Sequence, residues 1–271
     1  MTIPLSLSPP AMLAPTAKPV TFAFPGTGPD AGRQEASHPH QVAAHPSGKQ
    51  LLVPDLGSDK VWVLDRDEET KAWKVCGEVP TVAGYGPRHL VVKGKFQTRR
   101  MGHILTETQD ETMYVMNELS TSVTAYSYHT DPKQTKAVKT LPTLTPPKEL
   151  SPGMLGAEIL LAPASASYQE PLIYGSNRND PLPEGDSIAI YSPATSSDSI
   201  SGFELIAEVH TGINHLRALA FGGPEDKYVI AGGLNGGGIK IYERVESGRA
   251  LKEVAKLEAG VVKSPTSFVM V

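Results

Sequence analysis

The chain has 271 residues and a formal net charge of −4, from 25 basic and 29 acidic side chains. This near-balance argues against a nucleic-acid-binding protein whose affinity rests on a basic face. The single cysteine, Cys76, excludes an internal disulfide framework and a thiolate zinc cluster. No apolar run approaches the roughly 18 residues of a membrane span, so we expect a soluble cytoplasmic protein that binds neither nucleic acid nor membrane.

In chain order, residues 1–20 hold five prolines and no hydrophobic period, which predicts an irregular tail before a folded domain over 21–271. Short apolar strands then alternate with turns that contain proline or glycine. These strands form a repeating unit. It contains two short apolar strands, a third strand in which apolar and polar residues alternate, and a fourth strand with a weaker apolar pattern. We also expect partial strands at Val20–Phe24 and Ser264–Val271. If the sheets formed by these units do not close into a ring, they leave unpaired strand edges, which favour self-association.

The unit recurs four times, with Leu64, Tyr126, Tyr191 and Tyr242 at equivalent positions, 62, 65 and 51 residues apart. Four short strands per unit at this spacing are typical of propeller blades. No window shows the sustained apolar spacing of a capped helix. The alternative is a β-sandwich of the same strands, but recurrence of one four-strand unit favours an all-β propeller with four-stranded antiparallel blades.

Six short motifs follow one another in a fixed order along these units. They are Ser37–Val42 (SHPHQV), Val53–Gly57 (VPDLG), Gly86–Leu90 (GPRHL), Asn117–Leu119 (NEL), Ala157–Ile159 (AEI) and Ser176–Arg178 (SNR). Together they resemble the lactonase family of seven-bladed propellers, which includes 6-phosphogluconolactonases and fungal carboxymuconate cyclases. The resemblance runs from about residue 28 to residue 271.

The sequence departs from that family in two places. It has room for four blades and a fraction, and the missing part lies before Gly28, which suggests a truncated gene model or a degraded paralogue. The polar stretch Lys93–Glu111 stands where family members have a shorter turn. The resemblance implies chemistry on a small anionic lactone or carboxymuconate in a central channel, without a cofactor.

Two histidines in the first motif are candidates for chemistry. Residues two apart on a strand point to one face, so the rings of His38 and His40 are expected to share one space. A ring there could be a general acid or base, a metal ligand, or a hydrogen-bonding group at a blade corner. No third ligand at a suitable spacing supports a metal site. The resemblance places a polar site residue at His40, which we take as a catalytic candidate, and we keep His38 as a substrate-binding candidate.

Arg88 and Glu118 are the next candidates. Arg88 follows a rigid Gly-Pro turn, and its guanidinium suits bidentate capture of a carboxylate or phosphate, although it could instead pair with Glu118. His89 should alternate to the other face and be structural. Glu118 ends a strand beside apolar walls, where its pKa could be raised for acid–base work, or it could cap backbone amides in a turn.

Later blades supply further polar groups. Arg178 would be a second guanidinium at the same end of the ring as Arg88, and Arg217 begins an inner strand as Arg88 does. Glu158 is expected to be an arginine's partner. Asn177 is kept as a substrate-binding candidate, although acid or amide residues recur at its position in other blades (Asp55 and Asn117), which suggests a structural role.

These observations, with the resemblance, predict a lactonase or cycloisomerase. His40 and Glu118 would move protons, and Arg88 and Arg178 would hold the substrate's anionic groups. His38, Glu158, Asn177 and Arg217 would bind substrate. A non-catalytic scaffold or inactive truncated paralogue is the main alternative. A calcium-dependent gluconolactonase propeller is another, and it would need acidic and asparagine ligands on the axis.

Overall fold

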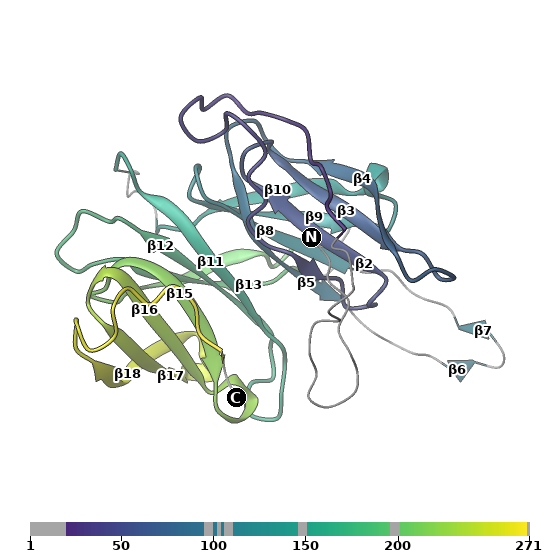
Figure 1. The fold of residues 1–271 in the computed structure, drawn as a ribbon. Helices are drawn as coiled ribbons and strands as arrows, with labels where there is room; N and C mark the ends of the chain where they lie inside the picture. Colours follow the sequence, from purple (N-terminus) through teal and green to yellow (C-terminus); the bar gives the residue numbers. More distant parts are fainter. Residues whose placement is uncertain are drawn as a thin grey trace, which may run out of the picture.

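The computed structural model describes residues 20–94, 100–101, 104–105, 111–145, 151–195 and 201–269. Its main strands form four antiparallel sheets of four strands each (Figure 1). The predicted all-β propeller and its four-stranded blades are therefore confirmed. Among the described residues, helical structure is confined to short 3₁₀ turns, and no helix is long and apolar enough to cross a membrane.

Each sheet follows the chain from its first strand to its last. The first holds β1 (Ala43–Ala44), β2 (Gln50–Asp55), β3 (Lys60–Arg66) and β4 (Trp73–Pro80). The second holds β5 (Pro87–Gly94), β8 (Glu111–Asn117), β9 (Ser122–Tyr128) and β10 (Lys136–Pro142). The third holds β11 (Leu155–Ala162), β12 (Leu172–Arg178), β13 (Ser187–Ser192) and β14 (Glu204–His210). The fourth holds β15 (Asn214–Gly222), β16 (Tyr228–Gly236), β17 (Ile239–Val245) and β18 (Ala250–Leu257).

Short elements connect these strands. They are the β6–β7 pair (Arg100–Met101 and Ile104–Leu105) and the 3₁₀ turns η1 (Pro132–Gln134), η2 (Pro224–Asp226) and η3 (Glu246–Gly248). The β6–β7 pair belongs to the polar stretch Lys93–Glu111. The strands that flank this stretch, β5 and β8, are neighbours in one antiparallel sheet.

The core lies in the seams between neighbouring sheets. The equivalent residues Leu64, Tyr126, Tyr191 and Tyr242 all lie on the third strand of their sheet and are at most 3% exposed. Clusters of buried apolar side chains join the first sheet to the second, the second to the third and the third to the fourth. Burying one such large side chain stabilises the fold by about 1.5–3 kcal/mol. Strand alternation thus fixes how each blade packs on the next.

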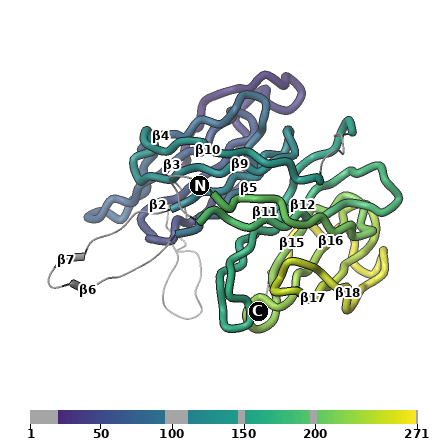
Figure 2. The backbone as a smooth tube through the Cα atoms, turned by 180° about the vertical axis from the view of Figure 1, so that it is seen from behind, coloured from purple at the N-terminus to yellow at the C-terminus, as the bar shows by residue number. Residues whose placement is uncertain are grey.

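The four sheets follow one another in a row, with the first and last at opposite ends in both views (Figures 1 and 2). The first strands of successive sheets lie together: β5 contacts β11, and β11 contacts β15. The polar residues at the ends of these strands are therefore brought to one place. Self-association through exposed edges stays a prediction, as does the boundary near residue 20, because residues 1–19 lie outside the described residues.

Within the described part of the chain, the two partial strands expected at the ends of the propeller are not formed. Residues 21–28 and 265–269 have no strand structure, because neither segment pairs along a neighbouring strand. Instead they pack through aromatic side chains. The ring of Phe24 stacks on Trp62 with centroids 5.3 Å apart, and Phe268 lies against Gly232 on β16.

Candidate functional site

The site is built where the first strands of three sheets are irregular. The pairing register shifts between Pro87 and His89 in β5, between Gly156 and Ile159 in β11, and twice between Asn214 and Ala218 in β15. A β-bulge bends its strand and re-aims the side chains within it. Arg88, Glu158 and Arg217 all lie in these irregular segments. The bulges therefore aim charged side chains from three blades at one region.

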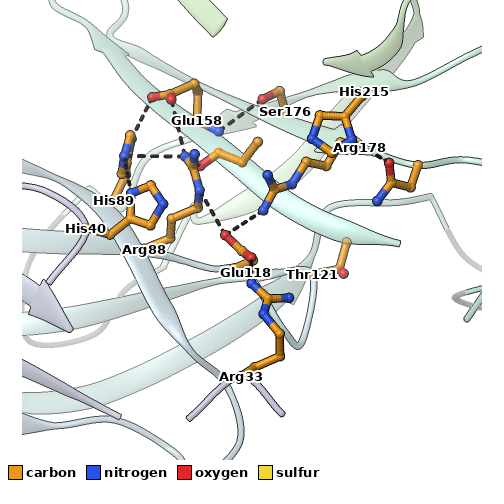
Figure 3. A network of polar contacts seen from close by, with 12 residues as sticks. Arg33, His40, Arg88, His89, Glu118, Thr121, Glu158, Ser176, Arg178 and His215 are labelled. Carbon is orange, nitrogen blue, oxygen red and sulfur yellow. Dashed lines mark hydrogen bonds and ion pairs between the residues drawn. The ribbon is translucent and has the colours of Figure 1, made fainter. Parts of the chain in front are cut away.

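Glu118 is the centre of the charged network (Figure 3). Its Oε2 lies 3.0 Å from Nε of Arg88 and 2.6 Å from Nη2 of Arg178. Its Oε1 accepts a hydrogen bond from Arg33, in the segment before β1. The side chains of Glu118, Arg88 and Arg178 are only 2%, 2% and 5% exposed. One carboxylate thus holds three guanidinium groups together.

The expectation of a raised pKa for Glu118 is wrong. Burial alone would raise it, but Arg178, Arg33 and Arg88 together hold the pKa of Glu118 below its usual value. A carboxyl group in this state stays ionised at neutral pH and is a poor proton donor. Burial lowers the pKa of Arg178 to about 10, so its guanidinium also stays charged at neutral pH. From the sequence, an ion pair with Glu118 was the alternative to substrate binding by Arg88, and this ion pair is formed.

Glu158 forms a second charged centre next to Glu118. Its Oε1 lies 3.2 Å from Nη1 of Arg88, and its Oε2 lies 2.6 Å from Nδ1 of His89. Its backbone N–H donates to the hydroxyl of Ser176. Burial would raise the pKa of Glu158, but His89 and Arg88 lower it overall. Glu158 is thus an ionised partner of an arginine, as the sequence suggested.

The expectation that His89 faces away from Arg88 is wrong. Nη1 of Arg88 lies 3.3 Å from Nε2 of His89, and both residues belong to the charged network. The bulge between Pro87 and His89 breaks the regular alternation of the strand, so two consecutive side chains reach the same region. Arg88 also donates a 2.7 Å hydrogen bond from Nη1 to the backbone oxygen of Ala157.

His40 reaches this network from the first sheet. Its Nδ1 lies 3.1 Å from Nε2 of His89, and the two rings meet edge to face (Figure 3). A backbone hydrogen bond of 2.9 Å from His40 to Pro54 fixes the segment on β2. Burial, Arg88 and His89 lower the pKa of His40 to about 4. The ring of His40 is therefore neutral at neutral pH and can accept a proton.

A cavity of about 250 Å³ opens beside these residues. It is lined by His40, Arg88, His89, Glu158, Arg217, Ala218, Leu219, Thr266 and Ser267. Among the described residues, the Arg217 side chain has no ion pair or hydrogen bond. Four guanidinium groups (Arg33, Arg88, Arg178 and Arg217) surround two carboxylates, which leaves a positive excess that suits an anionic ligand.

Four residues proposed from the sequence do not line this cavity: His38, Asn177, Glu118 and Arg178. Glu118 and Arg178 belong to the neighbouring charged network, where their side chains form a 2.6 Å ion pair. His38 contacts Glu35 at 2.9 Å, and its side chain is 43% exposed, so the two histidine rings do not share one space. Asn177 is fully buried, and its amide group donates to the backbone oxygen of Thr143 and to the hydroxyl of Ser187. Asp55 and Asn117 are likewise fully buried and make hydrogen bonds within their own blades. The position shared by Asp55, Asn117 and Asn177 therefore has a structural role in each blade.

Several residues of the site had not been expected. Arg33 lies in an irregular turn, and Thr266 and Ser267 lie in the chain after the last strand, where no periodicity marks a site. His215 lies beside Arg178, and its Nδ1 is 2.7 Å from the side-chain oxygen of Asn179. His215 has a positive φ of 58°, which is uncommon for a residue with a side chain and fits the bulge in β15.

The comparisons with known proteins agree with this architecture. The profile described as "Lactonase, 7-bladed beta-propeller" matches residues 7–270. The chain belongs to the lactonase family of seven-bladed β-propellers. It is 31% identical over 225 residues to a protein of Arthroderma benhamiae named "Probable 6-phosphogluconolactonase", covering 82% of this chain and 50% of that protein. It is 24% identical to the 6-phosphogluconolactonase of Bacillus subtilis, covering 84% and 56%. The chain thus spans about half the length of these relatives.

Solved structures show the same fold. A protein from Lactobacillus plantarum superposes with a TM-score of 0.72 at 22% identity, covering 97% of this chain and 66% of that one. The periplasmic gluconolactonase of Pseudomonas aeruginosa superposes with a TM-score of 0.67 at 22% identity, covering 92% and 61%. Within the described ranges, no three His, Cys, Asp or Glu side chains are grouped so that they could hold a metal ion.

Proposed function

We propose that the chain is a lactonase of the 6-phosphogluconolactonase type that hydrolyses a small anionic sugar lactone in the cavity beside His40. The observation that carries this proposal is the cavity itself, which is lined by a neutral histidine and two arginines. One of these arginines, Arg217, has no anionic partner among the residues that the structure describes. The names of the relatives support the same substrate class.

The chemistry uses this chain's own side chains. Water attacks the carbonyl carbon of the lactone while one of its protons passes to the ring of His40. The ring C–O bond of the lactone then breaks, and the departing oxygen takes the proton from His40, which yields an open-chain hydroxy acid. Arg88 and Arg217 stabilise the negative charge that develops on the carbonyl oxygen or is carried by the substrate. Glu118 holds Arg88 in place through an ion pair, and Arg178 in turn holds Glu118.

Hydrolysis fits the site better than cycloisomerisation of a carboxymuconate. In cycloisomerisation an acid of the protein must protonate a carbon atom. The low pKa of His40 and the lowered pKa values of Glu118 and Glu158 leave all three groups deprotonated at neutral pH. Hydrolysis instead begins with a group that accepts a proton, which His40 can do.

Replacing His40 with glutamine should lower kcat/KM about 10²–10⁴-fold, because the proton acceptor is lost. The measurement is acid release in a pH-stat from 6-phosphogluconolactone, corrected for spontaneous hydrolysis. His129→Gln, outside the site, is the matched control and should keep wild-type activity. If wild type hydrolyses no more lactone than buffer alone, the chain is a scaffold and not a lactonase.

The pH profile tests the same residue. Since His40 must be unprotonated to accept a proton and its pKa is about 4, activity should be constant near neutral pH and fall as pH drops through about 4. The measurement is kcat/KM for the hydrolysis of glucono-1,5-lactone between pH 3.5 and 7. This substrate carries no phosphate group that could titrate in the same range. A loss of activity centred at pH 6.5, the ordinary pKa of histidine, would contradict this assignment.

A further inference from the structure

The contacts of His89 with Glu158, Arg88 and His40 indicate which ring nitrogen carries the proton in His89 and in His40. Glu158 is ionised and can only accept hydrogen bonds, so its 2.6 Å contact requires a proton on Nδ1 of His89. A proton on Nε2 of His89 would face the positively charged guanidinium of Arg88, whose Nη1 lies 3.3 Å away, so this contact favours a lone pair on Nε2. Both neighbours therefore select one and the same neutral tautomer of His89.

This tautomer leaves only one choice for His40. Nε2 of His89 carries the lone pair and lies 3.1 Å from Nδ1 of His40, so Nδ1 of His40 must be the donor. A neutral imidazole has a single N–H group. The lone pair of His40 therefore lies on Nε2, for which the described residues offer no hydrogen-bond partner.

We propose that Glu158 and His89 are positioning residues that hold His40 in the Nδ1–H tautomer, so that its Nε2 atom is the proton acceptor in the cavity. This inference rests on the proposed function for its role in catalysis, but the tautomer is argued from the contacts and charge states of these residues and does not depend on that function. The carboxylate of Glu158 orients the ring of His89, and the ring of His89 orients the ring of His40. In hydrolases of other folds a carboxylate fixes the tautomer of the catalytic histidine directly. Here His89 stands between the carboxylate of Glu158 and the ring of His40.

Nitrogen NMR of the full chain labelled with ¹⁵N-histidine tests the tautomer directly. The signals of His40 are identified as those absent from His40→Gln. We expect Nδ1 of His40 to be pyrrole-like, with a bound proton, and Nε2 to be pyridine-like, with a lone pair. A pyrrole-like Nε2 of His40 in the wild-type protein overturns the proposal, whatever the activity of any variant.

Two variants at position 89 separate positioning from packing. His89→Phe keeps a ring but removes the acceptor, so His40 should move toward the Nε2–H tautomer and kcat/KM should fall at least about tenfold with little change in KM. His89→Gln keeps an acceptor near the place of Nε2 and should restore the tautomer and most of the activity. Equal loss in both variants with an unchanged His40 tautomer would show that His89 acts only through packing.

The two proposals can fail independently. A wild-type spectrum with the expected tautomer but no lactone hydrolysis would refute the proposed function and leave the arrangement of protons intact. Hydrolysis that depends on His40, together with the opposite tautomer, would refute the roles of Glu158 and His89 and leave the lactonase assignment intact.

Discussion

Replacing Glu118 with glutamine is expected to lower the free energy of unfolding at pH 7 by about 3–5 kcal/mol, because removing one partner leaves buried charges uncompensated. The charges concerned belong to Arg88 and Arg178, whose side chains are 2% and 5% exposed and which share this carboxylate. Urea unfolding followed by circular dichroism measures the difference. Glu78→Gln is the matched control, since Glu78 forms a 2.8 Å ion pair with Lys60 at the surface and should contribute less than about 1 kcal/mol.

The effect of Glu118→Gln should depend on pH in one direction. Because the folded-state pKa of Glu118 is lowered, its ionisation stabilises the wild-type protein above the unfolded pKa of about 4.3. That contribution begins to fall below about pH 4.3 and is lost as pH drops through the lower folded-state pKa. The unfolding free energies of wild type and variant should therefore converge over this range. A difference that stays constant from pH 7 to pH 3, or a loss no larger than that of Glu78→Gln, would contradict the ionised network.

Arg217→Ala should lower kcat/KM about 100-fold, the size of effect expected when a donor that stabilises developing negative charge is removed. Arg217 lines the cavity and has no ion pair among the described residues, so its removal should change stability by only about 0.5 kcal/mol. The measurement compares initial rates of lactone hydrolysis with the unfolding free energy of the same preparation.

The control for Arg217 is a surface arginine that pairs with a carboxylate. Arg249 contacts Glu170 at 2.5 Å, with both side chains largely exposed, and Arg249→Ala should leave kcat/KM unchanged. If Arg217→Ala keeps kcat/KM within about threefold of wild type, Arg217 does not bind the reacting substrate. If it loses activity and stability together, its role is structural instead.

The fold could be predicted from the sequence because each blade repeats the same pattern. Short alternating strands, turn residues and the equivalent positions of Leu64, Tyr126, Tyr191 and Tyr242 predicted the four sheets. The two terminal segments were predicted wrongly, because an apolar run such as Val20–Phe24 forms a strand only if a neighbouring strand offers backbone partners. Composition alone does not show whether such a partner exists.

The site was predictable only in part. Arg88, Glu118 and Arg178 meet as expected. Glu118 and Arg178 lie at the ends of the second strands of neighbouring sheets, and Arg88 begins the strand that pairs with the one before Glu118. The bulge that places His89 beside Arg88 leaves no mark in the sequence, and regular alternation assigns His89 to the wrong face. The pKa of Glu118 could not be foreseen either, because it depends on Arg33, which reaches the carboxylate from a segment 85 residues earlier in the chain.

The most direct test of the central claim is a crystal structure of the protein with bound 6-phosphogluconate, the product of the proposed reaction. We expect the ligand to occupy the cavity, with anionic groups against Arg88 and Arg217 and its carboxylate beside His40. Binding at another place on the blades, or a cavity that stays free of ligand while calorimetry shows binding in solution, would contradict the claim that these blade ends form the substrate site.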